Sequence, residues 1–386
     1  MVHIFSFKTL LLSCTIFAPG DWLPSSWRSW SHDQYPSVQL QPPSGPPTFQ
    51  RTIVAIGDIH GDFANLMKVL KMSGVVAENG SWTGAADYLV QTGDLLDRGD
   101  DTLDIYRYYE DLRVQASAHG GHLVSHLGNH EVMNLLGDWR YVWPSEIDTF
   151  ESVEARQRLI STGWIGKAWR ANYSITTRLP LHPALGVINV NYDHSKASSF
   201  QGLSHAALSF CHGGLAPSYS NLTPYPSAIN DIGTTLVTRL QDRKVQPLPH
   251  PPFPYEGIPA DATDDERELY GGYGPLWYRG WAEDDEDVVC KAVTGVLKKI
   301  GVKRLVMGHT LNLSHIVSRC DGKILIIDTG MTHAFGGVLS AAKFTYTMWP
   351  SDTQGRWIVR DMVTAMYPDH EEVLVDEVEE VKADFL

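Results

Sequence analysis

The sequence has few cysteines, an excess of acidic over basic residues and no long hydrophobic run. Four cysteines in 386 residues are too few for a disulfide scaffold, and none forms a CxxC pair, so no thiolate zinc site is expected. A formal net charge of -14 argues against a general affinity for nucleic acid. No hydrophobic run approaches the ~18 residues that a transmembrane segment requires. These absences leave a soluble acidic enzyme or binding domain.

The first fifty residues differ in composition from the rest of the chain. Residues 9–18 form a hydrophobic run typical of a secretory signal peptide, although the flanking residues make a poor cleavage site. We therefore assign 1–20 as a candidate signal peptide, with a loosely docked tail as the alternative. Residues 21–50 are rich in Pro, Ser and Trp and lack a helical or strand period, which predicts a linker.

Residues 51–368 are expected to form one α/β domain. Apolar strands are predicted at 52–56, 88–91 and 123–127, with helices at 62–72 and 102–114 between them. This alternation favours βαβ units and a parallel sheet, in which ligands bind beyond the carboxyl ends of the strands. Further strands are predicted at 207–211, 304–307, 323–327, 343–348 and 357–360.

The other segments are less regular. Residues 131–178 have a helical, aromatic-rich pattern that predicts a lid inserted over the strand ends. Residues 246–274 are rich in Pro, Gly and acidic side chains, which predicts a long surface loop. A helix is expected at 283–300, and the charged residues 369–386 are expected to form a peripheral tail.

A glycine and a residue able to bind metal follow most of the predicted strands. In chain order the candidate ligands are Asp58, His60, Asp94, Asn129, His212 and His309. Imidazole, carboxylate and amide groups at one sheet edge suit two divalent ions such as manganese, iron or zinc. Asp94, central in the set, is the candidate bridging ligand. Two ions about 3.5–4 Å apart activate a shared water and stabilise both ends of a phosphoryl displacement. This pattern predicts phosphate ester hydrolysis by attack of a metal-bridging hydroxide.

Further residues near these motifs suit the same reaction. His130 follows Asn129, and a histidine oriented by the nearby Asp97 would act as a general acid toward the leaving alkoxide. Arg98 and Arg279 are candidates for contacts with the phosphate oxygens. Each residue alone also has a structural explanation, such as a turn, a buried histidine or a surface ion pair. The ordered combination, with each motif after an apolar strand, favours the catalytic interpretation.

The motifs resemble those of a known family. Three are similar to the signature of the phosphoprotein phosphatases within the calcineurin-like metallophosphoesterases: Gly57-Asp58-Ile59-His60-Gly61, Gly93-Asp94-Leu95-Leu96-Asp97-Arg98-Gly99 and Gly128-Asn129-His130-Glu131. Four others resemble the Shewanella-like branch of that superfamily: Cys211-His212-Gly213-Gly214, Leu276-Trp277-Tyr278-Arg279-Gly280, Gly308-His309-Thr310 and Asp328-Thr329-Gly330-Met331. The resemblance extends over roughly residues 51–366, most of the chain.

The resemblance implies a fold and specific residue roles. The implied fold is a two-sheet β-sandwich flanked by helices, with a dinuclear metal site at the strand ends. The implied first metal site consists of Asp58, His60 and Asp94, and the second of Asp94, Asn129, His212 and His309. The implied proton-donating pair is Asp97 and His130, and the implied phosphate ligands are Arg98, Asn129 and Arg279. The implied substrate is a phosphoprotein or phosphopeptide.

One motif departs from the serine/threonine phosphatases. Their Ser-Ala-Pro-Asn-Tyr loop, part of the active-site rim, is replaced here by residues 328–333. Since the Shewanella-like branch includes phosphotyrosine-preferring members, phosphotyrosine and phosphoserine/threonine both remain candidate substrates, and we expect poor inhibition by toxins that bind that rim. Candidate stacking surfaces for an aryl group are Met331, His333, Trp139 and Trp143.

Two other functions remain as alternatives. A nucleotide hydrolase similar to the symmetrical diadenosine tetraphosphatases would share the first three motifs. A non-enzymatic phosphate-binding scaffold is disfavoured, because no candidate metal ligand or acid is missing.

Two weak signals favour the secretory pathway (ER lumen, vacuole or secretion) over the cytoplasm. The first is the hydrophobic run at 9–18, and the second is a set of Asn-x-Ser/Thr sequons at Asn79, Asn172, Asn221 and Asn312. In an oxidising compartment Cys290 and Cys320 could pair, whereas Cys211, beside a candidate metal ligand, is expected to stay buried and reduced.

Overall fold

The computed structural model of this protein describes residues 40–196 and 203–383. The candidate signal peptide at 1–20 and most of the predicted linker at 21–50 lie outside these residues. No helix in the described part of the chain is both long and apolar enough to cross a membrane.

Two sheets form the centre of the molecule, as the resemblance implies. The seven-stranded sheet has the order β12-β11-β10-β1-β2-β3-β4, and the five-stranded sheet has the order β5-β6-β7-β9-β8. The strands of the larger sheet are β1 (Phe49–Ile56), β2 (Tyr88–Gln91), β3 (His122–His126), β4 (Tyr173–Ser174), β10 (Ala341–Pro350), β11 (Arg356–Met366) and β12 (Glu371–Lys382). Those of the smaller sheet are β5 (Thr176–Pro180), β6 (Ala207–Cys211), β7 (Arg304–Met307), β8 (Val317–Arg319) and β9 (Ile324–Ile326).

Each sheet contains a set of neighbouring parallel strands. In the larger sheet β1, β2, β3 and the short β4 run parallel, and in the smaller sheet β6, β7 and β9 do so. β10, β11 and β12 extend the larger sheet by antiparallel pairing, which begins at the outer side of β1. Since the parallel strands end at one edge of each sheet, their following loops can meet there.

The side chains of β1 alternate between two hydrophobic cores. Ile53 and Ala55 belong to the core between the sheets, together with Phe210 of β6 and Val306 of β7. Val54 and Ile56 belong to the second core, beneath the helices. This alternation follows from the two-residue period of a strand, and it explains why the last four residues of β1, Ile53 to Ile56, are all apolar.

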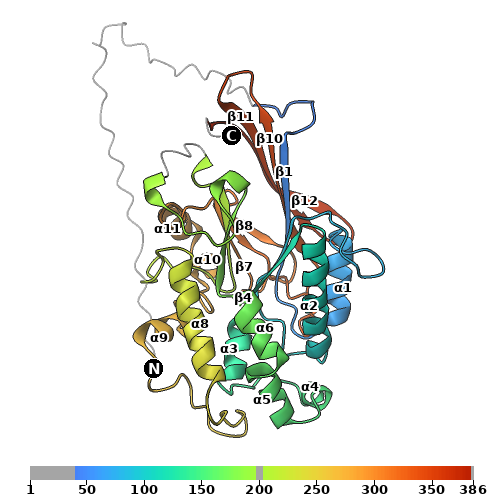
Figure 1. The fold of residues 1–386 in the computed structure, drawn as a ribbon, viewed down its shortest axis with the longest axis vertical. Coiled ribbons are helices and arrows are strands. Elements are labelled where there is room, and N and C mark those ends of the chain that lie inside the picture. Colours follow the sequence, from blue (N-terminus) through green and yellow to red (C-terminus); the bar gives the residue numbers. More distant parts are fainter. Residues whose placement is uncertain (1–39, 197–202, 384–386) are drawn as a thin grey trace, which may run out of the picture. The chain divides into compact units, whose positions relative to one another are not determined.

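The helices follow the strands and flank the sheets (Figure 1). Asp62 caps the N-terminus of α1 (Phe63–Met72), because its side chain accepts a hydrogen bond from the Asn65 backbone N–H. α1 packs beside α2 (Thr102–Ala118). The helical insertion consists of α3 (Asn129–Leu135), α4 (Pro144–Thr149), α5 (Val153–Ser161) and α6 (Trp164–Asn172). The remaining α-helices of the described residues are α8 (Ser227–Gln241), α9 (Asp264–Tyr270), α10 (Gly280–Glu283) and α11 (Glu286–Ile300).

Three segments differ from the sequence-based expectation. The segment 131–178 is predicted to be helical, but its last residues form β4 and the beginning of β5. The expected charged tail at 369–386 contains β12, which pairs with β11 along its whole length and forms an edge of the sheet. Alternate charged residues are typical of an edge strand, because one of its faces meets solvent. The expected loop at 246–274 contains α9, which begins with a capping box formed by Thr263 and Glu266.

Candidate active site

The site lies where the two sets of parallel strands end. β1 leads to Asp58 and His60, β2 to Asp94, and β3 to Asn129. From the smaller sheet, β6 leads to His212 and β7 to His309. All six predicted metal ligands are buried, at 5% exposure or less. The structure therefore brings together side chains that are up to 251 positions apart in the sequence.

The backbone at the strand ends has unusual conformations. His60, Asp94, Asp97, Arg98 and His309 all have φ between 46° and 67°, the left-handed region that non-glycine residues rarely adopt. Such conformations concentrate at functional sites, where the surrounding structure maintains them.

The glycines in the motifs leave space for the ligands. At Gly128 a Cβ atom would collide with the side chain of Asp94, and at Gly308 it would collide with that of Asp58. Both carboxylates therefore lie directly against backbone, which explains the glycine that precedes Asn129 and His309.

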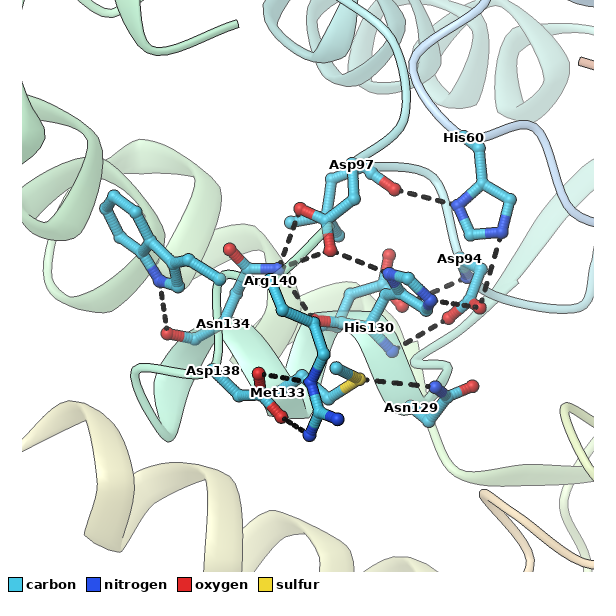
Figure 2. A network of polar contacts seen from close by, with 12 residues as sticks. His60, Asp94, Asp97, Asn129, His130, Met133, Asn134, Asp138 and Arg140 are labelled. Atoms are coloured by element: carbon cyan, nitrogen blue, oxygen red, sulfur yellow. Dashed lines mark hydrogen bonds and ion pairs between the residues drawn. The ribbon is translucent and has the colours of Figure 1, made fainter. Parts of the chain in front are cut away.

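Asp94 lies at the centre of two groups of potential metal ligands. Its Oδ2 atom lies 3.7 Å from Nε2 of His60 and 3.3 Å from Nε2 of His212 (Figure 2 shows the His60 side). His60, Asp94 and His130 offer ligand atoms within 4.8 Å of one another, and so do Asp94, His212 and His309. A carboxylate shared by two ligand groups is what the predicted bridging position requires.

The charge states of His60, His309 and Asp94 favour metal binding. Burial lowers the pKa of His60 to about 3, and burial also keeps the pKa of His309 well below its ordinary value. Burial would raise the pKa of Asp94, but the neighbouring imidazoles, His212 first, outweigh it and keep the pKa well below its usual range. Neutral imidazoles and an ionised carboxylate are the forms that bind metal. Nε2 of His309 is buried without a hydrogen-bond partner, which fits a position facing a metal ion.

His130 and Asp97 form the expected pair. Nδ1 of His130 lies 2.6 Å from Oδ2 of Asp97, and both residues are buried (Figure 2). Burial would lower the pKa of His130, but the carboxylates of Asp94 and Asp97 outweigh it and raise the pKa. The Asp97 contact occupies Nδ1, so Nε2 remains as the nitrogen that can donate a proton in the pocket.

Two arginines line the same pocket, as predicted for phosphate ligands. The guanidinium of Arg98 lies 4.1 Å from the ring centroid of Tyr141 and 4.8 Å from that of Phe335. Arg279 donates a hydrogen bond from Nη1 to the backbone oxygen of His309 at 2.9 Å. The rings and this hydrogen bond orient both guanidinium groups toward one cavity.

The structure adds residues that the sequence analysis did not single out for the site. Asp328 lies in the pocket beside Asp58, and burial raises its pKa to about 6. Asp328 follows β9, so the pattern used for the other candidates, a polar residue shortly after a strand, could have identified it. Glu131 accepts hydrogen bonds from the backbone N–H groups of Asp94, Leu95 and Gly128 at 2.7–3.0 Å, and thereby holds Asp94 in position.

The predicted stacking surfaces are partly wrong. Met331 and Trp139 are buried, at 1% and 4% exposure, and Nε1 of Trp139 donates to the backbone oxygen of Asn134. His333 and Trp143 contact each other, with ring centroids 5.6 Å apart. The aromatic side chains that line the pocket are instead Tyr141, Trp277 and Phe335. The sequence does not show which of these side chains are buried, because their burial depends on tertiary packing.

Comparison with known proteins places this geometry in a family. The family model for the calcineurin-like phosphoesterases matches residues 51–313. An uncharacterised protein of Schizosaccharomyces pombe is 36% identical over 291 residues, which cover 75% of this chain and 76% of that protein. Shewanella-like protein phosphatase 1 of Plasmodium berghei is 32% identical over 285 residues, which cover 72% of this chain and 67% of that protein.

Solved structures show the same fold at lower identity. The cold-active protein-tyrosine phosphatase of a psychrophilic Shewanella species superposes with a TM-score of 0.58, over 84% of this chain and 80% of that one. The sequences are 20% identical in this comparison, so the likeness establishes the fold.

Proposed function

The chain belongs to the calcineurin-like phosphoesterases, and from this membership we propose that it is a dinuclear-metal-dependent phosphomonoesterase acting on phosphoproteins. The observation that best supports the proposal is the position of Asp94 in both groups of potential metal ligands. Two divalent ions (manganese, iron or zinc) held there would supply an activated water and neutralise charge on the phosphoryl group. Asp58, whose Oδ2 lies 4.0 Å from Nε2 of His60, would complete the first metal site together with His60, so that His130 stays available as the proton donor. Asn129, His212 and His309 would complete the second.

The other residues of the pocket would bind the substrate and donate a proton. Arg98 and Arg279 would bind the non-bridging phosphate oxygens, and Asn129 lies in the same pocket. His130, oriented by Asp97, would donate its Nε2 proton to the leaving oxygen.

The proposed substrate is a phosphotyrosine or phosphoserine/threonine side chain, with phosphotyrosine turned over at least as well. Two features support this preference. Tyr141, Trp277 and Phe335 offer apolar surface around the phosphate-binding arginines, which suits an aryl group. The structurally similar Shewanella enzyme is named a protein-tyrosine phosphatase.

The proposal is tested by metal analysis together with turnover. We expect two metal ions per chain and hydrolysis of phosphotyrosine and phosphoserine peptides by the purified full-length protein. Diadenosine tetraphosphate is the comparison substrate, because the nucleotide hydrolases share three motifs with this chain. Faster turnover of the dinucleotide than of either peptide would favour the alternative function. Absence of turnover in metal-loaded protein would favour the non-enzymatic scaffold.

We further propose that the protein enters the secretory pathway. The structure contains a disulfide bond between Cys290 and Cys320, and disulfides persist mainly in oxidising compartments. Cys211 is free and buried, and burial raises the pKa of its thiol to about 12, so it is unreactive. Of the four sequons, Asn79 and Asn172 are exposed, and they are the expected glycosylation sites.

Expression in a eukaryotic host tests the compartment. We expect glycosidase treatment to increase the electrophoretic mobility of the protein. The double substitution Asn79→Gln and Asn172→Gln should abolish this shift, whereas Asn221→Gln, at a half-buried sequon, should preserve it. An unglycosylated protein with an intact N-terminus and free thiols at Cys290 and Cys320 would place it in the cytoplasm.

A further inference from the structure

Arg156 of α5 is completely buried beside the proton-donating pair, although it lies in the helical insertion. Its side chain has 0% exposure. Its Nη2 atom donates one hydrogen bond to Oδ1 of Asp97 at 3.1 Å and another to Oε1 of Glu146 at 2.9 Å. Nη1 donates to the side-chain oxygen of Asn134. A buried guanidinium persists only with such partners, because it has lost its hydration.

Asp97 connects Arg156 to His130. One carboxylate oxygen of Asp97 contacts Nδ1 of His130, and the other contacts Arg156. Asn134 donates to both oxygens at 2.9 Å, as Figure 2 shows, and its own oxygen accepts from Arg156. The carboxylate is thus fixed by donors from three sides, and its orientation determines the orientation of the His130 ring.

Two features make this arrangement dependent on an arginine. The guanidinium lies 4.5 Å from the ring centroid of Trp139 and 5.4 Å from that of Phe150, which restricts its plane. From this position one planar group reaches Asp97, Asn134 and Glu146 together. The compact ammonium of a lysine has no such fork, so it would satisfy fewer of these partners.

The backbone of Asp97 also requires support. Its φ of 67° lies in the left-handed region, which is unfavourable for a residue with a Cβ atom. Contacts to the side chain maintain such a conformation. The ion pair with Arg156 supplies one of these contacts from outside the strand-end loops.

We propose that Arg156 is a positioning residue for proton donation, so that the helical insertion forms part of the catalytic machinery. Through Asp97 it keeps Nε2 of His130 directed at the leaving oxygen, and its loss slows the step in which that proton moves. The inference rests on the proposed phosphomonoesterase function, in which His130 protonates the leaving group.

Leaving-group dependence tests this role, because a merely structural role would not change it. Arg156→Lys and Arg156→Met are compared with the wild type on phenyl phosphate, a poor leaving group, and on 2,4-dinitrophenyl phosphate, a good one. We expect kcat on phenyl phosphate to fall about tenfold to a hundredfold more than kcat on the dinitrophenyl ester, with similar KM and metal content. If Arg156→Met does not fold, Arg156→Lys decides, because it retains the buried positive charge.

The matched control is Arg304→Met. Arg304 is similarly buried and paired with Asp361, but it lies at the start of β7, whereas the site lies at the end. We expect lower stability and an unchanged ratio of the two kcat values. Glu146→Gln provides a second test, because it alters the partner of Arg156 without removing the guanidinium; it should change the ratio in the same direction as Arg156→Lys, and less.

The outcomes separate this inference from the proposed function. Equal losses on both esters in a folded, metal-loaded Arg156→Lys variant, with Glu146→Gln also leaving the ratio unchanged, would overturn the positioning role alone. A wild type without phosphatase activity, or a His130→Ala variant that loses equally on both esters, would instead contradict the proposed function.

Discussion

Two buried arginine clusters in this molecule have similar chemistry and different locations. Arg156 pairs with Asp97 and Glu146 near the carboxyl ends of the strands. Arg304 of β7 pairs with Asp361 of β11 at 2.8 Å and with Glu377 of β12 at 3.1 Å, and so connects the two sheets. In the first cluster Asp97 contacts the proposed acid, His130, whereas in the second Arg304 contacts Glu377 of the edge strand β12.

The comparison shows that a buried ion pair does not by itself indicate function. Both arginines have side-chain exposure of 2% or less, and each is paired with an aspartate whose pKa, despite burial, is lowered by the cations and other donors around it. What distinguishes them is the end of the strand at which they lie, since ligands bind beyond the carboxyl ends of parallel strands. Substitutions in the two clusters should therefore affect different quantities: turnover in the first and stability in the second.

The largest difference is expected between Asp94, which lies beside the first cluster at 3.8 Å from Nε2 of His130, and Asp361 of the second cluster. Asp94→Asn should lower the metal content and reduce turnover by orders of magnitude, because a neutral amide replaces a bridging carboxylate poorly. Asp361→Asn is the matched control, buried to a similar extent at 2% exposure, and should retain metal and turnover per folded molecule. Metal analysis and steady-state kinetics measure both effects. Full metal occupancy in Asp94→Asn would contradict the bridging role.

The next largest effect is expected for His130→Ala. Loss of the proposed general acid should reduce turnover of substrates with poor leaving groups by about 10²–10⁴-fold. The loss should be smaller for nitrophenyl phosphate, whose leaving group needs less protonation, and both metal ions should remain. Kinetics on a series of aryl phosphates provides the measurement, and an equal loss throughout the series would exclude His130 as the acid.

Arg304→Met should affect stability more than catalysis. Removing one partner of a buried ion pair leaves Asp361 close to Lys303, at 3.0 Å, as its remaining cation, so the free energy of unfolding should fall by about 3 kcal/mol. Denaturant titration measures this change. If kcat per folded molecule fell as well, the second cluster would not be purely structural.

The smallest expected effect is a pH dependence of stability from Asp361. Burial would raise its pKa, but Lys303 and Arg304 outweigh burial and lower it. A lowered pKa in the folded state stabilises the protein above the unfolded value of about 3.9, and this contribution is lost as the pH falls through the folded pKa. Thermal unfolding between pH 6 and pH 3 should therefore show a shallower acid-side decline for Asp361→Asn than for the wild type. Parallel curves would show that Asp361 does not contribute in this range.

Much of the candidate site could be predicted from local sequence. The strands expected at 88–91, 207–211 and 304–307 coincide with β2, β6 and β7, and the residues that follow them, Asp94, His212 and His309, form one group of potential metal ligands. This works because a short apolar strand and the glycine and ligand after it form one local unit. The parallel arrangement then brings the ends of such units together.

The contribution of the insertion could not be predicted in this way. The sequence predicts a helical lid at 131–178, but nothing near Arg156 indicates that it is buried or that it contacts Asp97, 59 positions earlier. A charged residue on a short helix more often faces solvent. The same limit applies to Tyr141 and Phe335. Both rings contact Arg98, although they are far from it and from each other in the sequence.

The sequence by itself determined which groups are available for the proposed chemistry, because the type and order of the candidate ligands, from Asp58 to His309, are local properties of strand ends. Only the tertiary structure decided which other side chains support that chemistry. Packing buried Met331 and Trp139, paired β12 with β11 and directed Arg156 toward Asp97. These outcomes depend on contacts between distant segments, and the free energy of such contacts is set by burial and pairing in the folded chain, which no local pattern encodes.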